Sequence, residues 1–229
     1  MKIGLLECDH VLEKFRPIAG DYSDMFRALF PSLELVNYDV CNGHFPASPH
    51  ECDGYLVTGS KHSVYDEVDW ILELKAFVKA IYESGRKYVG VCFGHQMLGE
   101  ALGGKVEKAK TGWHVGVHSF DVTAKEDWMK PPLEQFNLLM SCQDQVVKLP
   151  ENSVVLAKTP TCPVAMFRVG ENMLGIQAHP EFPKPYARAL LESRRERIGA
   201  ELVEAALKRF DLPLTDRVVA QWIERFLEK

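Results

Sequence analysis

The segment Tyr88-Val89-Gly90-Val91-Cys92-Phe93-Gly94 predicts a short apolar strand that turns sharply into a helix. Glycines two residues before and two residues after Cys92 fit the small-x-nucleophile-x-small pattern, because a tight turn leaves little space around a nucleophile in strained backbone. The start of the following helix favours a thiolate there, since the positive end of the helix dipole lowers the pKa of a thiol. A free cysteine is more often a small buried apolar residue, but the flanking glycines favour Cys92 as a nucleophile.

Strands and helices alternate on either side of this turn, a pattern typical of βαβ crossovers onto a mainly parallel sheet with ligands at the carboxyl ends of its strands. Apolar periodicity predicts strands at 2–7, 33–40, 54–58 and 88–91, and helices at 22–30, 70–84 and from 94.

Farther along the chain, from about 106 to 178, successive strand-like runs predict an antiparallel extension of the sheet. A largely helical tail follows from about 184, interrupted at 211–213, with a new helix start at Thr215. We therefore expect one α/β domain over residues 1–229, a three-layer sandwich around a mainly parallel sheet.

The composition is that of an ordinary globular protein, with 46% hydrophobic and 26% charged residues and a formal net charge of -5. No basic run marks a nucleic-acid partner, and the mixed signs of 192–197 predict a solvated helix face. Six cysteines without a C-x-x-C pair are expected to be reduced. No signal peptide or membrane span is apparent, so we expect a cytoplasmic location.

A thiol nucleophile needs a base, and the base needs a partner that fixes its tautomer. Gln177-Ala178-His179-Pro180-Glu181 supplies both, since residues two apart in extended backbone point the same way and Pro180 favours that conformation. A lone histidine is more often structural, and His95 competes for the same role. His95, however, lies in the first turn of the helix after Cys92, where packing or capping is the better expectation.

Amide hydrolysis places negative charge on the carbonyl oxygen, so two backbone N–H donors are expected close to Cys92. The amide of Phe93, directly after the nucleophile, is the first candidate. The second is Gly59 in the loop after the strand 54–58, where glycine lets the backbone come close. A plain strand-ending turn would also explain that loop.

Together these motifs resemble the class I glutamine amidotransferases, whose glutaminase domains carry a G-x-C-x-G-H-Q elbow and a late H-P-E. The likeness covers about 50 to 182, and includes Gly59-Ser60-Lys61-His62-Ser63. Stand-alone proteins similar to the glutaminase domain of GMP synthase, a group that includes γ-glutamyl peptidases, are the nearest in pattern. The resemblance implies a flavodoxin-like fold, a Cys92-His179-Glu181 triad and no cofactor or metal.

The same resemblance implies the residues that bind substrate. Gln96 would hold the amino-acid end of the substrate, and 141–146 resembles a substrate-side segment that usually reads S-H-x-D-x-V. Here Cys142 replaces the histidine, which changes how this segment would grip a glutamyl group. The implied substrate-binding residues are Ser60, Gln96, Ser141, Cys142, Gln143 and Asp144.

Three functions are compatible with this pattern. In the first, the chain hydrolyses the amide of glutamine and passes ammonia to a separate synthetase subunit, because the sequence contains no P-loop. In the second, it is a stand-alone γ-glutamyl peptidase acting on glutathione-like small molecules. In the third, it is a non-catalytic regulatory member of the fold. The sequence does not indicate the oligomeric state.

Overall fold

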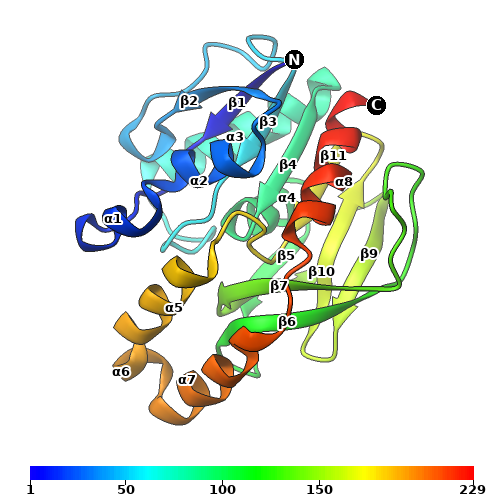
Figure 1. Cartoon of the computed structure of the whole chain (residues 1–229). Coiled ribbons are helices and arrows are strands. Elements are labelled where there is room, and N and C mark those ends of the chain that lie inside the picture. Colours follow the sequence, from blue (N-terminus) through cyan, green and yellow to red (C-terminus); the bar gives the residue numbers. More distant parts are fainter.

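The computed structural model describes all residues from 1 to 229. Nine strands form one sheet, and two short strands form a separate ribbon (Figure 1). The order across the sheet is β2 (Glu34–Tyr38), β1 (Lys2–Leu6), β3 (Gly54–Val57), β4 (Lys87–Val91), β11 (Met173–Ile176), β10 (Cys162–Val169), β9 (Ser153–Thr159), β6 (His114–Val122) and β7 (Gln135–Cys142). The first five strands are parallel. The remaining four continue the sheet in antiparallel fashion, so the predicted extension is confirmed.

Helices cover both faces of the parallel strands, because alternate residues of each strand point to opposite faces. Leu56 of β3 belongs to the core formed with α2 (Tyr22–Leu29) and α8 (Asp216–Glu228), whereas Tyr55 and Val57 belong to the core formed with α3 (Asp69–Ser84) and α4 (Phe93–Ala101). Figure 1 shows α8 and α4 on opposite sides of the sheet. The three-layer sandwich predicted from the sequence is therefore confirmed.

The helical tail packs against the antiparallel strands. It comprises α5 (Lys184–Ser193), α6 (Arg195–Ile198) and α7 (Ala200–Leu207), shown in yellow-orange to orange in Figure 1. Leu190, Val203 and Ala206 from this tail share a core with Val117 and Leu139 of β6 and β7. The short helix α1 (Arg16–Ala19) lies near α5. The tail is thereby fixed beside the strand that approaches His179.

Two strands were not predicted from the sequence. Residues 105–108 and 144–148 form the ribbon strands β5 (Lys105–Lys108) and β8 (Asp144–Lys148). Their mixed polar sequence lacks clear alternation, and the pairing joins segments far apart in the chain. Val146 of β8 packs closely on Gly99 of α4, so this ribbon places Asp144 beside the elbow helix. No helix has the length and apolarity needed to cross a bilayer.

Four neighbouring parallel strands bring the predicted site together. β1, β3, β4 and β11 run in one direction, so the segments that follow their carboxyl ends meet at one edge of the sheet. These segments contain Asp9, Gly59, Cys92 and His179 respectively. Asp9 links two of them, since its carboxylate accepts bonds from the Lys61 backbone N–H and Nζ at 3.0 and 2.8 Å.

Candidate active site

Cys92 occupies the sharp turn that the sequence predicts. Its φ is 53° and its ψ is -98°, a strained conformation for a residue with a side chain. The strain is held from both sides, because the Cys92 N–H donates to the Ile176 carbonyl at 2.9 Å and the Cys92 carbonyl accepts from the Gln96 N–H at 3.0 Å. The thiol thus lies at the junction of β4 and α4, at the positive end of the helix dipole.

Gly90 makes this turn possible. A Cβ atom at Gly90 would lie 2.3 Å from the backbone of Gly94, so the backbone itself would have to move. We expect Gly90→Ala to lower the free energy of unfolding by about 3 kcal/mol or more, beyond the usual cost of overpacking. Gly112→Ala is the control, since Gly112 has a φ of +81° but no atom within 4 Å. If urea denaturation gave equal losses for the two variants, the elbow would not be tightly packed.

His179 and Glu181 form a buried pair beside Cys92. The Nδ1 atom of His179 lies 2.7 Å from Oε1 of Glu181, and both side chains are almost inaccessible. The His179 ring also stacks on Phe182, with centroids 3.9 Å apart and planes 9° apart. The backbone N–H of His179 donates to the Leu139 carbonyl of β7 at 2.8 Å. With Nδ1 occupied by the carboxylate, Nε2 is the ring nitrogen left for a reacting group.

The segment with His179 and Glu181 follows β11 and turns toward β7. Extended backbone places Glu181 beside the His179 ring, and His179 forms an isolated bridge with Leu139 after β11 ends at Ile176. Gly59 lies opposite, since a Cβ built on it would be 3.0 Å from His179 Cε1 and 3.7 Å from the Cys92 Cβ. The three predicted triad residues and the predicted oxyanion loop therefore converge on one point.

Electrostatics favour a charged His179 ring. Burial lowers the pKa of His179, but the negative charges of Glu181 and Cys92 outweigh burial and raise the pKa from 6.5 to about 10. Because the folded pKa lies above the unfolded one, the ring's charge stabilises the fold fully below pH 6.5, and this contribution is lost as pH rises through about 10. Glu181 Oε2 has no other partner, so the carboxylate depends on this ring for its compensation.

We expect Glu181→Gln to move the alkaline limb of kcat/KM downward by at least about one pH unit. The amide oxygen can still accept a bond from Nδ1, but it lacks the charge that raises the His179 pKa, while the burial that lowers it remains. A pH profile from 6 to 11 measures the shift. An unchanged alkaline limb would separate Glu181 from the ionisation of His179.

Two backbone amides are available as the predicted oxyanion donors. Phe93 is the first residue of α4, where an N–H has no acceptor within the helix. The Gly59 N–H donates to no group within the protein. The Thr58 hydroxyl fixes this loop, accepting from the Cys8 N–H at 2.9 Å and donating to the Gly59 carbonyl at 3.1 Å.

His95 is a core residue, as expected from its position in α4. Its side chain is fully buried and meets the ring of Phe167 edge-on, with centroids 5.0 Å apart. Burial lowers the pKa of His95 to about 4, which keeps the ring neutral at ordinary pH. It does not face the cleft that contains Cys92.

The predicted substrate-binding residues line a mostly polar cleft next to Cys92, with a cavity volume of about 110 Å³. Gln96 is buried and its Nε2 donates to the Asp144 carbonyl at 2.8 Å, so it positions the substrate-side segment. The Asp144 carboxylate accepts from the hydroxyls of Ser63 at 2.5 Å and Tyr65 at 3.1 Å. Ser60, Ser141, Cys142 and Gln143 line the same cleft.

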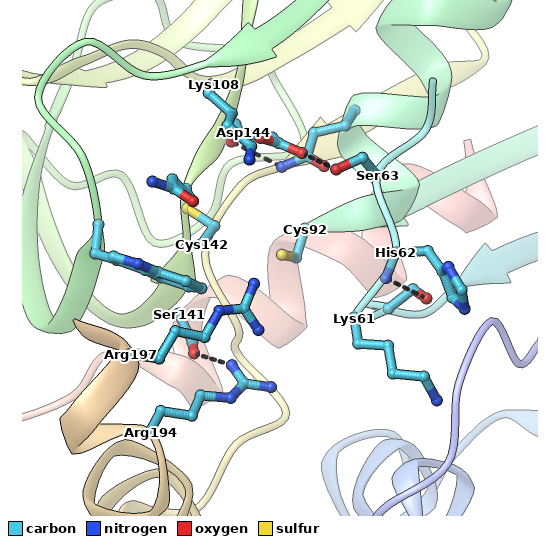
Figure 2. A pocket seen from close by; sticks show the side chains of 14 residues that line it. Lys61, His62, Ser63, Cys92, Lys108, Ser141, Cys142, Asp144, Arg194 and Arg197 are labelled. Carbon is cyan, nitrogen blue, oxygen red and sulfur yellow. Dashed lines mark hydrogen bonds between the residues drawn. The ribbon is translucent and has the colours of Figure 1, made fainter. Parts of the chain in front are cut away.

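Cys142 takes the place where the resembling family usually has histidine. Its side chain is buried, and burial raises the pKa of its thiol well above the usual value. It is therefore a neutral apolar wall beside Cys92, where an imidazole would offer a hydrogen bond (Figure 2).

Basic residues at this cleft were missed by the sequence reasoning. Arg194 and Arg197 reach toward Cys92 from the end of α5 and from α6, and Lys108 lies on the other side near Asp144 (Figure 2). The prediction of a solvated face for 192–197 is confirmed for the exposed Glu192, Glu196 and Arg197. Arg194 is half-buried, and it lines the cleft together with Arg197. The mixture of positive and negative charges in 192–197 does not indicate which arginines face the cleft.

One group of side chains has the composition of a metal site, but it lies away from Cys92. Ligand atoms of His10, Asp39 and Cys41 lie within 4.8 Å of one another. Both ring nitrogens of His10 are already occupied, by Asp21 and Asp39 at 3.1 Å each. These carboxylates raise the pKa of His10 against the effect of burial, which favours a protonated ring over a metal-binding one.

Comparison with known proteins points to one family. The family model described as glutamine amidotransferase class-I matches residues 24–194. Gamma-glutamyl peptidase 2 of Arabidopsis thaliana is 29% identical over 221 residues, covering 90% of this chain and 88% of that protein. The glutamine-hydrolyzing GMP synthase of Clostridium botulinum is 34% identical over 129 residues, 56% of this chain but 24% of the synthase.

A solved structure has the same fold across the whole chain. A glutamine amidotransferase from Thermotoga maritima superposes with a TM-score of 0.77 at 18% identity, covering 99% of both chains. At that identity the likeness concerns the fold. Because the family model spans well over half of the sequence, the chain belongs to the class I glutamine amidotransferase family.

Proposed function

We propose that this protein hydrolyses a γ-glutamyl amide bond, with Cys92 as nucleophile and residues 1–229 acting as one domain. The observation that carries the proposal is the buried pair of His179 and Glu181, 2.7 Å apart, beside a cysteine in strained backbone at a helix start. Strained backbone at a cysteine and a buried carboxylate with one unpaired oxygen both cost stability, and a purely structural role for these residues explains neither.

The proposed reaction has two halves. The Cys92 sulfur bonds to the γ-carbonyl carbon, the carbon–nitrogen bond breaks, and His179 gives its proton to the departing amine. Water then attacks the thioester while His179 takes one of its protons, and glutamate and the Cys92 thiolate are released. The amides of Gly59 and Phe93 stabilise the negative oxygen in both halves.

Stand-alone γ-glutamyl peptidase activity is the version that we favour. The Arabidopsis relative named as a γ-glutamyl peptidase matches this chain over 88% of its own length, so the two proteins are of similar extent. Ammonia delivery to a separate synthetase subunit is the second candidate, supported by the likeness to part of a GMP synthase. Because all six cysteines are unpaired, we place either activity in a reducing compartment, the cytoplasm.

The test is glutamate release by the purified protein from glutamine and from γ-glutamyl dipeptides. Faster turnover of dipeptides supports the peptidase version, and glutamine turnover that rises with a synthetase supports the second. Mass spectrometry after reaction with a glutamine-analogue electrophile should locate the label on Cys92. A protein that neither turns over any of these compounds nor reacts at Cys92 would be the non-catalytic member of the fold.

A further inference from the structure

The space around Cys92 has two parts with different linings. One part contains Gln96, Ser63 and Asp144, and the other contains His179, Phe182 and Leu190. Arg194 lines both, as do Cys92 and Ser141. The two parts meet at the nucleophile, so a substrate attacked there would place one half in each.

The proposed chemistry decides which half goes where. His179 must give a proton to the departing nitrogen, so the amine half has to lie in the part lined by His179. The glutamyl half then lies in the other part, where the Asp144 carboxylate suits its ammonium group. This assignment rests on the proposed hydrolysis of a γ-glutamyl amide.

Arg194 is the charged group of the amine part that lacks an anionic partner. The other cations there are paired, Lys61 with Asp9 at 2.8 Å and His179 with Glu181 at 2.7 Å. The guanidinium of Arg194 donates from Nη1 to the Ser141 hydroxyl at 3.1 Å and bonds to no carboxylate. Its side chain is half-buried next to Phe182 and Leu190. A partly desolvated guanidinium beside apolar walls is well suited to a carboxylate, which its planar fork can bind through two bonds.

Other cationic side chains do not offer the same arrangement. The guanidinium of Arg197 lies 4.9 Å from the ring centre of Trp113, is exposed, and lines only the glutamyl part. Lys108 also lines only that part. Arg194 alone combines missing charge compensation with a position next to both Cys92 and His179.

We propose that Arg194 binds the carboxylate of the amine half of the substrate. The preferred substrates are then γ-glutamyl amino acids or peptides with a free carboxylate near the scissile amide. Glutamine lacks this group, because its departing half is ammonia. Arg194 is thus a specificity-determining residue outside the triad.

The test compares γ-glutamyl-alanine with γ-glutamyl-alaninamide, which has nearly the same size but no carboxylate on the amine half. For the wild-type protein we expect kcat/KM to be about 10- to 100-fold higher for the acid, as for the loss of a charge-assisted pair. Arg194→Gln should lower kcat/KM for the acid by that factor and change it for the amide by less than about threefold. Arg194→Lys should recover part of the loss.

Arg188→Gln is the matched control, since Arg188 lies on α5, is exposed, and covers the Phe210 ring away from the cleft. It should leave the acid-to-amide ratio unchanged. Equal losses for both substrates in Arg194→Gln would assign Arg194 a structural part through Ser141 and overturn the inference. Equal rates for the two substrates in the wild type would overturn it while leaving γ-glutamyl hydrolysis intact. Hydrolysis of neither substrate, nor of glutamine, would overturn both proposals.

Discussion

Replacing Cys92 with alanine is expected to lower γ-glutamyl hydrolysis by at least about 10⁴-fold, because Cys142, the other thiol that lines the cleft, is kept neutral by burial, which raises its pKa. The fold should survive, since alanine at a φ of 53° bears the same backbone strain as cysteine. We expect the free energy of unfolding to change by about 1 kcal/mol, the cost of removing one small buried group. Steady-state kinetics and urea denaturation measure the two effects separately.

Cys41→Ala is the control for this variant, since Cys41 is half-buried near His10, away from the cleft. It should keep normal activity and normal labelling of Cys92 by the glutamine-analogue electrophile. Residual turnover by Cys92→Ala at more than a few per cent of the wild-type rate would show that another nucleophile, or none, carries the reaction.

His179→Gln is expected to lower kcat/KM by about 10³- to 10⁴-fold, through the loss of the acid and base that serves both halves of the reaction. Glutamine can still donate an N–H to the buried Glu181 carboxylate, so the variant should fold. The rate of alkylation of Cys92 by iodoacetamide at pH 7 should fall as well, because the positive ring that favours the thiolate is gone.

His50→Gln is its control, since His50 is exposed on a loop remote from the sheet edge that carries Cys92. Both activity and alkylation should stay within about twofold of wild type, as for an ordinary surface substitution. If His179→Gln retained the wild-type alkylation rate while losing turnover, the ring would not be the source of the thiolate, and the pKa of His179 would need another explanation.

Local chemistry explains what the sequence could predict. The elbow depends on steric rules that Gly90, Cys92 and Gly94 display within five residues, and the strands of the sheet are apolar enough to recognise. The pairing of His179 with Glu181 could be predicted for the same reason, because it follows from extended backbone over three residues. The parallel topology then brings Gly59 to them without any further information.

Long-range pairing explains what the sequence could not predict. β5 and β8 become strands only by pairing with each other across some forty residues of chain, and their own residue pattern is too polar to predict a strand. Arg194 likewise lies in a charged helical stretch where inward and outward arginines look alike. Its orientation is set by the packing of Leu190 and Leu191 on the antiparallel strands, which periodicity alone does not fix.

The helical tail begins only three residues after Glu181, and the family model match ends at Arg194. His179 and Glu181 are therefore followed directly along the chain by the helical tail, whose residue Arg194 forms one wall of the cleft. Substitutions of Arg194 and Arg197 change the charge of that wall, and neither residue belongs to a strand. Variation at these positions thus offers a route to new substrate preference in which Cys92, His179 and Glu181 stay in place, and the same positions are the ones to change in a redesign.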